Sequence, residues 1–334
     1  MIMLKIDEKK IGIFVLAYNR LDHLKKVIRP LVRHTHPNDP IYIFADSSNT
    51  KSSDVEKVHS FLKKLNKKKF KIVIQKKNLG LKENWWRAYN YMYSKYDKVI
   101  CLEDDTIINK EFLKFMIDNL IKFEKNAKVM SITGYAFPTK LPRNYNYNLY
   151  FTKRSNSWGQ GSWSRVWKLF KKNKEKNLDI LLNKKKLKIL KKGGNDIVHM
   201  FVHDYLKYIS SIQIWWIWNI LKNDGLCINP INTLVKNVGF DGTGTHYTKK
   251  IKKSKTQNIR KKNLIKLDFV LYDKEINKNF NNLFEISNKL RIIYKVLPIW
   301  LIIYLYKIIN LYKSFLNIKN YLSKIFIINN ISYL

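Results

Sequence analysis

One short apolar run, Val99-Ile100-Cys101-Leu102, ends in three consecutive carboxylates, Glu103-Asp104-Asp105. This segment decides the fold. In a chain with a formal net charge of +39, this triplet concentrates negative charge at the end of a buried strand. Desolvation and mutual repulsion make such a cluster costly unless a cation or a catalytic role compensates. A solvated turn would explain an arbitrary acidic triplet. Ligands of an open α/β sheet, however, lie outside the carboxyl ends of the strands, so we predict a functional site here.

Short apolar runs alternate with amphipathic stretches on both sides of this segment. We expect strands at 11–16, 41–45, 72–75, 99–102 and 129–133, and helices at 21–31, 55–65, 83–93 and 112–123, with the first helix interrupted by Pro30. Strands that alternate with helices of about ten residues are typical of a parallel sheet covered on both faces, with right-handed crossovers. The predicted fold class is therefore α/β.

Polar residues follow each of the first strands. They are Ala17-Tyr18-Asn19-Arg20, Asp46-Ser47-Ser48-Asn49 and Lys77-Asn78-Leu79-Gly80-Leu81. In a parallel sheet these groups and the triplet meet at one edge, where a nucleoside diphosphate can use all of them. Tyr18 would face a base, Asp46 would accept a hydrogen bond from the base or ribose, and Arg20 would meet phosphate. The triplet would hold a divalent cation.

Glycine motifs and composition exclude several classes of protein. No Gly-x-Gly-x-x-Gly and no Walker loop follows the first strand, which argues against dinucleotide oxidoreductases and P-loop enzymes. Two cysteines without a metal or disulfide pattern, and a first segment without a signal-peptide core, predict a cytoplasmic protein. Only nine of the 64 basic residues are arginine, which favours solvated lysine faces or an anionic membrane surface over nucleic acid.

Seven motifs in chain order resemble a known family. They are Phe14-Val15-Leu16-Ala17-Tyr18-Asn19-Arg20, Phe44-Ala45-Asp46, Asn78-Leu79-Gly80-Leu81, Leu102-Glu103-Asp104-Asp105, Ser131-Ile132-Thr133-Gly134-Tyr135, Ser157-Trp158-Gly159-Gln160-Gly161-Ser162-Trp163 and Asn237-Val238-Gly239-Phe240-Asp241-Gly242-Thr243-Gly244-Thr245-His246. Together they resemble the nucleotide-sugar glycosyltransferases of GT-A (Rossmann-like) fold. More narrowly, they resemble bacterial family 2 and N-acetylglucosaminyltransferase I-like enzymes of surface-polysaccharide synthesis. The resemblance covers roughly residues 10–248.

This resemblance implies an activity and a cofactor. The expected enzyme is a metal-dependent, inverting glycosyltransferase of the hexosyltransferase type, which uses a nucleotide-sugar donor and a saccharide or lipid-linked acceptor in bacterial envelope synthesis. The triplet would be its DXD-type motif, with Asp105 as the ligand of Mn²⁺ or Mg²⁺ and His246 as a second contact to metal or diphosphate. The implied nucleotide-sugar residues are Tyr18, Arg20, Asp46, Asn78, Gly80, Glu103 and Asp104.

The second half would bind the acceptor. Trp158, next to Gly159, is the candidate ring for stacking on a sugar, whereas Trp163 and Trp167 have the spacing of a buried helix face. Many relatives carry an acid that is a plausible base, but the counterpart here, 210–216, has no carboxylate. Asp204 and Asp241 are the remaining candidates for the base.

The chain divides into four expected regions. They are a nucleotide-sugar-binding half (1–135), an acceptor-binding half of the same domain (136–248), a basic linker (249–289) and a helical tail (290–334). The apolar run 296–306 is too short for a membrane span, which needs about 20 residues. It predicts either helices that lie in a membrane interface, on the inner face of the plasma membrane, or a helical hairpin that packs on the main domain.

Two other functions stay open. A nucleotidyltransferase also uses a metal at a sheet edge, although Tyr18-Asn19-Arg20 does not supply the glycine- and lysine-rich loop that such enzymes usually need. A non-enzymatic basic module for membranes or nucleic acid would not depend on Asp105, and its binding would fall steeply with salt.

Overall fold

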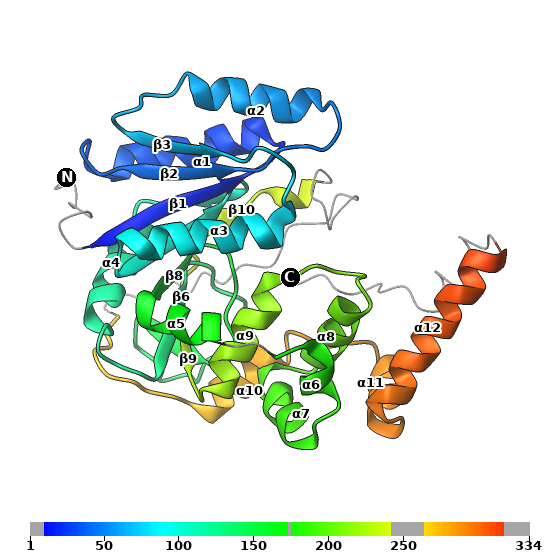
Figure 1. Ribbon diagram of the computed structural model, residues 1–334. Helices are drawn as coiled ribbons and strands as arrows, with labels where there is room; N and C mark the ends of the chain where they lie inside the picture. The colour runs from blue at the N-terminus through cyan, green and yellow to red at the C-terminus, as the bar shows by residue number, and fades with distance from the viewer. Residues whose placement is uncertain (1–9, 173–174, 242–263, 317–334) are drawn as a thin grey trace.

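The computed structural model describes residues 10–172, 175–241 and 264–316, which form a large sheet, its covering helices and a helical extension (Figure 1). The strands are β1 (Ile11–Ala17), β2 (Ile41–Ala45), β3 (Phe70–Ile74), β4 (Lys98–Glu103), β5 (Thr106–Ile108), β6 (Val129–Thr133), β7 (Leu149–Thr152), β8 (Gln160–Trp163), β9 (Leu226–Pro230) and β10 (Val235–Asn237).

The main sheet has the order β3-β2-β1-β4-β8-β6-β9-β7. The pairings β1–β2, β2–β3 and β1–β4 are parallel, as the sequence predicts. Strand β8, which the sequence does not predict, lies antiparallel between β4 and β6. Residues Gln160–Trp163 include two small ones and lack a strand pattern, yet Gly161 fits this position because a Cβ there would lie 2.6 Å from the Met116 methyl group. The fold is thus α/β with a mainly parallel sheet.

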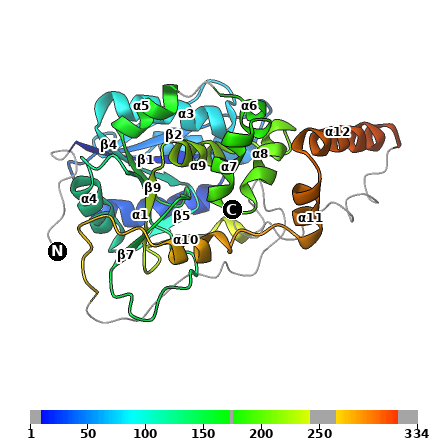
Figure 2. The same ribbon diagram turned by 90° about the horizontal axis from the view of Figure 1, so that it is seen from below.

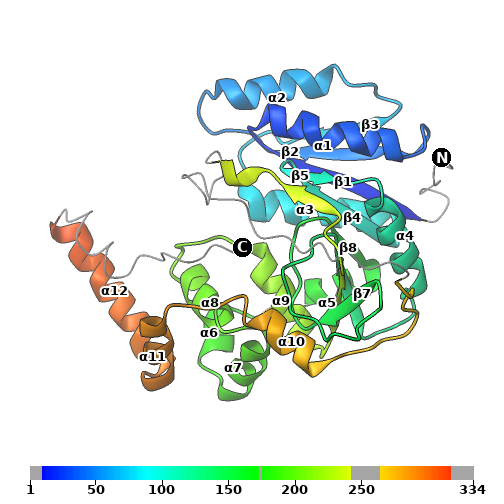
Figure 3. The ribbon, with the colours of Figure 1, turned by 180° about the vertical axis from the view of Figure 1, so that it is seen from behind.

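Helices cover both faces of the sheet. Figure 2 shows α3 and α5 on one face and α1 and α4 on the other, and Figure 3 shows α1 and α2 from the second side. The helices are α1 (Leu21–His34), α2 (Ser53–Lys63), α3 (Gly80–Lys95), α4 (Phe112–Lys122), α5 (Ser164–Lys172), α6 (Asn177–Leu181), α7 (Lys184–Leu190), α8 (Ile197–Tyr205), α9 (Ile212–Lys222), α10 (Lys274–Asn281), α11 (Asn288–Val296) and α12 (Ile299–Leu316), with short 3₁₀ turns η2 (Lys191–Gly193) and η3 (Gly239–Asp241).

Helix α1 continues through Pro30, so the predicted interruption is wrong. Its buried stripe, which includes Val27, Ile28 and Leu31, runs past the proline. Packing of that stripe against the sheet therefore outweighs the hydrogen bond that the proline ring removes.

An aromatic cluster fills the space between α3, α5 and α9. Trp167 stacks on Phe170 with ring centroids 5.3 Å apart, and Trp85 and Trp216 contact the same rings. Trp163 is also buried, and its indole Nε1 donates a hydrogen bond to the Leu120 carbonyl at 2.8 Å. The prediction that Trp163 and Trp167 are buried is confirmed, but only Trp167 is on a helix, because Trp163 ends strand β8.

A second apolar core joins α6, α7, α8 and α9 to the extension α11–α12. The described part of the predicted linker, 264–289, does not act as a spacer. Its helix α10 places Ile276 and Phe280 in the main core, and Phe284 follows them there. The remainder of the linker, 249–263, lies outside the described residues. None of the helices in the described part of the chain is both long and apolar enough to cross a bilayer.

Candidate active site at the carboxyl edge of the sheet

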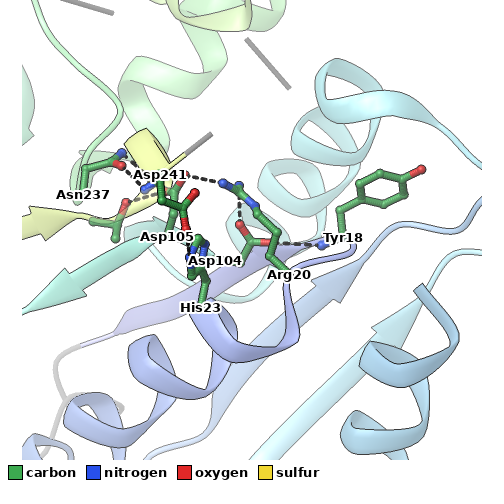
Figure 4. Close-up of polar contacts among 9 residues, drawn as sticks. Tyr18, Arg20, His23, Asp104, Asp105, Asn237 and Asp241 are labelled. Atoms are coloured by element: carbon green, nitrogen blue, oxygen red, sulfur yellow. Dashed lines mark hydrogen bonds and ion pairs between the residues drawn. The ribbon is translucent and has the colours of Figure 1, made fainter. Parts of the chain in front are cut away.

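The acidic triplet lies at the carboxyl ends of β1 and β4. These strands are parallel, and Leu16 is paired with Glu103 at their ends. The Tyr18 amide donates a hydrogen bond to Asp104 Oδ2 at 3.2 Å (Figure 4). The Arg20 guanidinium spans both aspartates, with Nη2 2.6 Å from Asp104 Oδ1 and Nη1 2.9 Å from Asp105 Oδ2. The prediction that these strand ends converge is confirmed.

Burial and crowding shift the protonation of the triplet. Burial raises the pKa of Glu103 to about 8, and the negative charges of Asp105 and Asp104 add to this shift. A hydrogen bond from Ser157 and the positive charge of Arg20 work in the opposite direction and lower this pKa. Burial also raises the pKa of Asp104 to about 7, and Arg20 opposes that shift. Burial works to lower the pKa of Arg20, but Asp104 and Asp105 outweigh it and raise that pKa. Arg20 is therefore the positive group that compensates the triplet.

Asp46 follows β2 and fixes the neighbouring loops. Its Oδ1 accepts hydrogen bonds from the amides of Ser47, at 2.8 Å, and Leu79, at 2.9 Å. Both bonds use Oδ1, so Oδ2 is the oxygen that could accept a bond from a ligand. Asn78 Nδ2 donates to the Ser47 carbonyl at 2.6 Å and lies 3.5 Å from the Tyr18 hydroxyl. The structure thus brings Tyr18, Asp46 and Asn78 together.

Gly80 starts α3 in the left-handed region, with φ +72°. A Cβ there would meet no atom within 4 Å, so conformation rather than space explains the glycine.

A second strand pair carries the segment 237–241 onto the triplet. Strand β10 pairs antiparallel with β5, and Asn237 lies opposite Thr106. The Val238 amide donates to the Asp105 carbonyl at 2.9 Å. Gly239 packs so closely on Asp105 Oδ2 that a Cβ would overlap that oxygen. This segment forms the wall of the site next to Asp105.

Asp241 belongs to the same wall. Its Oδ2 lies 2.9 Å from His23 Nε2 at the start of α1, and 40% of its side chain is exposed. His23, Asn237 and Gly239 were not predicted as site residues. Asn237 and Gly239 stand in the last quoted motif, whereas the role of His23 depends on a contact 218 residues along the chain.

The carboxylates suit a hard divalent cation. Mg²⁺ and related ions are commonly held by one or two carboxylates together with substrate phosphates. Asp104 and Asp105 are two adjacent carboxylates, both now paired with Arg20. Within residues 10–172, 175–241 and 264–316, no three His, Cys, Asp or Glu side chains form a ready-made metal cluster. His246 lies outside the described residues. The donor chemistry fits a cation that takes its other ligands from a diphosphate.

The structure does not support Trp158 as an open stacking surface. The residue is 6% exposed, and its ring packs edge-on against Tyr135, with centroids 4.5 Å apart. Gly159, with φ +69°, is explained by packing, because a Cβ would lie 2.6 Å from the Phe112 ring. Both residues shape the core under the site.

Asp204 is enclosed by hydrogen-bond donors. Its Oδ2 accepts from Trp215 Nε1 at 3.1 Å and from Asn177 Nδ2 at 3.0 Å, and the Ser211 amide lies 3.3 Å from Oδ1. Lys82 Nζ, two residues after Gly80, is 4.0 Å from Oδ2. Asp204 therefore lies beside the segment 210–216, but only 6% of its side chain is exposed.

A basic groove of about 600 Å³ lies at the opposite end of the sheet, near the residues that precede β9. Its lining includes Lys153, Lys191, Lys192, Lys274 and Lys278. It shares no residue with the acidic triplet.

Parts of the chain are similar to solved structures of other proteins. A mannosyltransferase from Pyrobaculum calidifontis, solved with GDP-Man and Mn²⁺, is 10% identical over 48% of this chain and 46% of its own, with a TM-score of 0.35. TarS (residues 1–349) from S. aureus is 13% identical over 66% and 57% of the two chains, with a TM-score of 0.37. A cytidylyltransferase from Leptospira borgpetersenii is 14% identical over 50% and 66%, with a TM-score of 0.32. The chain thus spans about half the length of the first two structures.

No curated protein matches the chain. Residues 12–177 match the model of the family Glycosyl transferase family 2. The matched region contains β1 to β4 and their polar ends, including Arg20, Asp46 and the acidic triplet. Residues 12–177, just under half of the chain, are therefore similar to the glycosyl transferase family 2 domain.

Proposed function

We propose that this protein transfers a sugar from a nucleoside diphosphate to a hydroxyl group of a saccharide or lipid-linked acceptor. The observation that carries the proposal is the meeting of Arg20, Asp46 and the Asp104–Asp105 pair at one sheet edge, inside the region that is similar to the family 2 domain. We extend it to hexosyl transfer with inversion, in bacterial envelope polysaccharide synthesis, on the resemblance of the ordered motifs.

Each residue at the strand ends would bind a different part of the donor. Asp46 Oδ2 would accept a hydrogen bond from the base or ribose, next to the ring of Tyr18. Arg20 would exchange its aspartate partners for the diphosphate, with which a guanidinium forms paired hydrogen bonds. Asp104 and Asp105 would then hold the divalent cation. Such a cation supplies positive charge where the departing diphosphate becomes more negative.

The transfer needs a group that takes the acceptor proton. The anomeric carbon loses its bond to the diphosphate oxygen and gains one to the acceptor oxygen, and the acceptor proton passes to a carboxylate. We assign this role to Asp241, which is exposed, lies in the wall of the site and is oriented by His23. Asp204 has its oxygens engaged by three donors, so we assign it to positioning α9 against Asn177.

The test is a thermal-shift screen of nucleotide sugars with and without Mn²⁺, followed by product analysis with the best donor. We expect one nucleoside diphosphate sugar to stabilise the protein by about 2.7 kcal/mol at a concentration of 100 times its dissociation constant, and to do so more strongly with Mn²⁺. Turnover should release a nucleoside diphosphate. Release of pyrophosphate from a nucleoside triphosphate and a sugar phosphate would instead identify a nucleotidyltransferase. Stabilisation by no nucleotide would favour the non-enzymatic basic module.

Two aspartate variants and a control assign the base. Asp241→Asn should bind the donor normally and lose turnover, whereas Asp204→Asn should retain measurable turnover. The control, Asp118→Asn, changes an exposed aspartate on α4 that pairs with Lys114. Full turnover by Asp241→Asn together with none by Asp204→Asn would transfer the role to Asp204.

A further inference from the structure

The extension α11–α12 has two unlike faces. On α12, Ile299, Ile302 and Ile303 are buried against the core of α8 and α9. Large apolar side chains are exposed on the other side of α12, at Trp300, Tyr304 and Ile308, and on α11, at Ile292 and Val296, with exposed fractions from 42% to 70%. We call these five residues the exposed stripe.

The stripe stands clear of the rest of the described chain. Figures 1 and 3 show α12 projecting from the body of the molecule, well away from the sheet. Isolated apolar side chains are normal on a protein surface, but three exposed ones on successive turns of α12, with two more on the adjoining α11, indicate a binding face. We therefore consider which binding partner covers this face.

The charges around the stripe indicate what that occupant is. Lys289, Arg291, Lys295 and Lys307 are exposed on the same two helices. From residue 286 to the last residue of the sequence there is no aspartate or glutamate, whereas seven lysines and arginines occur. A surface that carries both apolar groups and negative charge matches this combination, and a bilayer with anionic lipids is such a surface.

The residue types in the stripe favour the same occupant. Trp and Tyr are enriched at the level of the lipid headgroups, where an amphipathic ring has one apolar and one hydrated side. The methylene groups of a lysine can contact the apolar part of such a surface while its ammonium group stays in the headgroup layer.

We propose that the exposed stripe of α11–α12 docks the protein on the surface of an anionic lipid bilayer. In Figures 1 and 3, α12 projects on the same side of the molecule as η3, which carries Asp241. Docking would therefore bring the candidate active site close to the lipid surface. This last consequence rests on the proposed function and suits an acceptor carried by a lipid, whereas the docking itself does not depend on it.

The first experiment tests the stripe. Full-length protein is sedimented with vesicles of phosphatidylcholine alone, or of phosphatidylcholine and phosphatidylglycerol in equal parts. We expect binding to the mixed vesicles, and a loss on the order of tenfold in the triple variant Trp300→Ser/Tyr304→Ser/Ile308→Ser. The control is Leu182→Ser/Ile265→Ser/Phe269→Ser, which removes three apolar side chains that are each about half exposed and lie elsewhere. Equal binding by the stripe variant and the wild type would overturn the proposal.

The second experiment separates local from diffuse charge. Replacing Lys289, Arg291, Lys295 and Lys307 by Gln should weaken binding to the mixed vesicles. The matched control replaces Lys191, Lys192, Lys274 and Lys278, which line the basic groove, by Gln. We expect little loss for the control. Equal losses for the two variants would show attraction by overall charge and would overturn docking through α11–α12.

A third measurement excludes a second copy of the chain as the occupant. Analytical ultracentrifugation without vesicles should give a monomer, for the wild type and for the stripe variant alike. A wild-type dimer that the stripe substitutions dissociate would overturn the proposal and identify a homodimer interface. None of these assays uses donor or acceptor, so a failure of docking is distinguishable from a failure of the glycosyl-transfer proposal.

Discussion

Arg20 and Asp105 lie in contact across the ends of β1 and β4, with 2.9 Å between Nη1 and Oδ2. The same guanidinium reaches Asp104 at 2.6 Å, so one side chain compensates two crowded carboxylates. A divalent cation or a diphosphate would compete with these bonds, because the proposed cation would bind the same oxygens and the proposed diphosphate the same nitrogens. Donor binding should therefore be coupled to the release of Arg20 from the aspartates.

The variant Arg20→Gln tests that coupling. Without the guanidinium, two buried carboxylates lose their positive partner, so the free energy of unfolding should fall by about 1–3 kcal/mol at neutral pH. Mn²⁺ should restore more stability to the variant than it adds to the wild type, because the ion replaces the lost charge. Thermal unfolding with and without Mn²⁺ measures both effects. Arg87→Gln, which breaks an exposed pair with Glu83, is the control and should show neither.

The pH dependence of metal binding follows from the raised pKa values of Glu103 and Asp104. Their folded-state pKa values, about 8 and about 7, lie above the ordinary values of 4.5 and 3.8. The folded protein therefore binds more protons than the unfolded chain between these limits, so these groups make the protein less stable as pH rises through that window. A cation requires the ionised forms and displaces the protons. Mn²⁺ affinity, measured by calorimetry, should rise from about pH 6 to about pH 8, and a flat profile would contradict these protonation states.

Gly239→Ala should damage the site and leave the fold intact. The new methyl group would overlap Asp105 Oδ2 and press on Arg20 Nη1, 3.0 Å away. We expect donor affinity to fall by at least about tenfold, which is 1.4 kcal/mol, with little change in the thermal midpoint. Lys236→Ala, on the exposed side of β10, is the matched control. Normal donor affinity in Gly239→Ala would show that the segment 237–241 moves away from Asp105 when the donor binds.

Two buried histidines should make the helical part sensitive to acid. Burial lowers the pKa of His199 to about 3, helped by His203, and lowers the pKa of His203 to about 4. Tyr294, Tyr208 and Tyr306 surround them. Below the ordinary pKa of 6.5 the unfolded state binds more protons, so stability is complete above that pH and is lost as pH falls. Each histidine should lower the free energy of unfolding by up to about 1.4 kcal/mol for each unit by which the pH falls below its ordinary pKa.

The double variant His199→Gln/His203→Gln should flatten that acid slope in denaturant titrations. His36→Gln, outside the helical part, should leave the slope as in the wild type. An unchanged slope in the double variant would mean that other groups cause the acid sensitivity.

Local patterns predicted the first half of the chain well. Strands β2 and β6 have the predicted bounds, and the polar ends of β1, β2 and β4 meet as expected, because each strand is a continuous apolar run. The sequence did not predict β8, since Gly161 and Ser162 carry no strand signal. The close approach of α4 explains Gly161, and Ser162 Oγ donates a hydrogen bond to the Met130 carbonyl on β6.

Contacts between distant segments explain the other differences. The burial of Trp158 depends on Tyr135 and Phe137, and no local pattern distinguishes it from an open loop tryptophan. The contact of Asp105 with Asn237 spans 132 residues, and that of His23 with Asp241 spans 218. Both depend on the pairing of β5 with β10, which are strands of three residues each and too short to show a periodic pattern.

The most direct test of the account is calorimetric titration of the full chain with its best nucleotide sugar, with and without Mn²⁺, for the wild type and Asp105→Asn. The account predicts that Mn²⁺ strengthens donor binding to the wild type and to the control Asp118→Asn. It predicts that this gain disappears in Asp105→Asn, whose thermal unfolding stays cooperative. Equal Mn²⁺-dependent binding by Asp105→Asn would contradict the assignment of the acidic triplet as the metal corner of a nucleotide-sugar site.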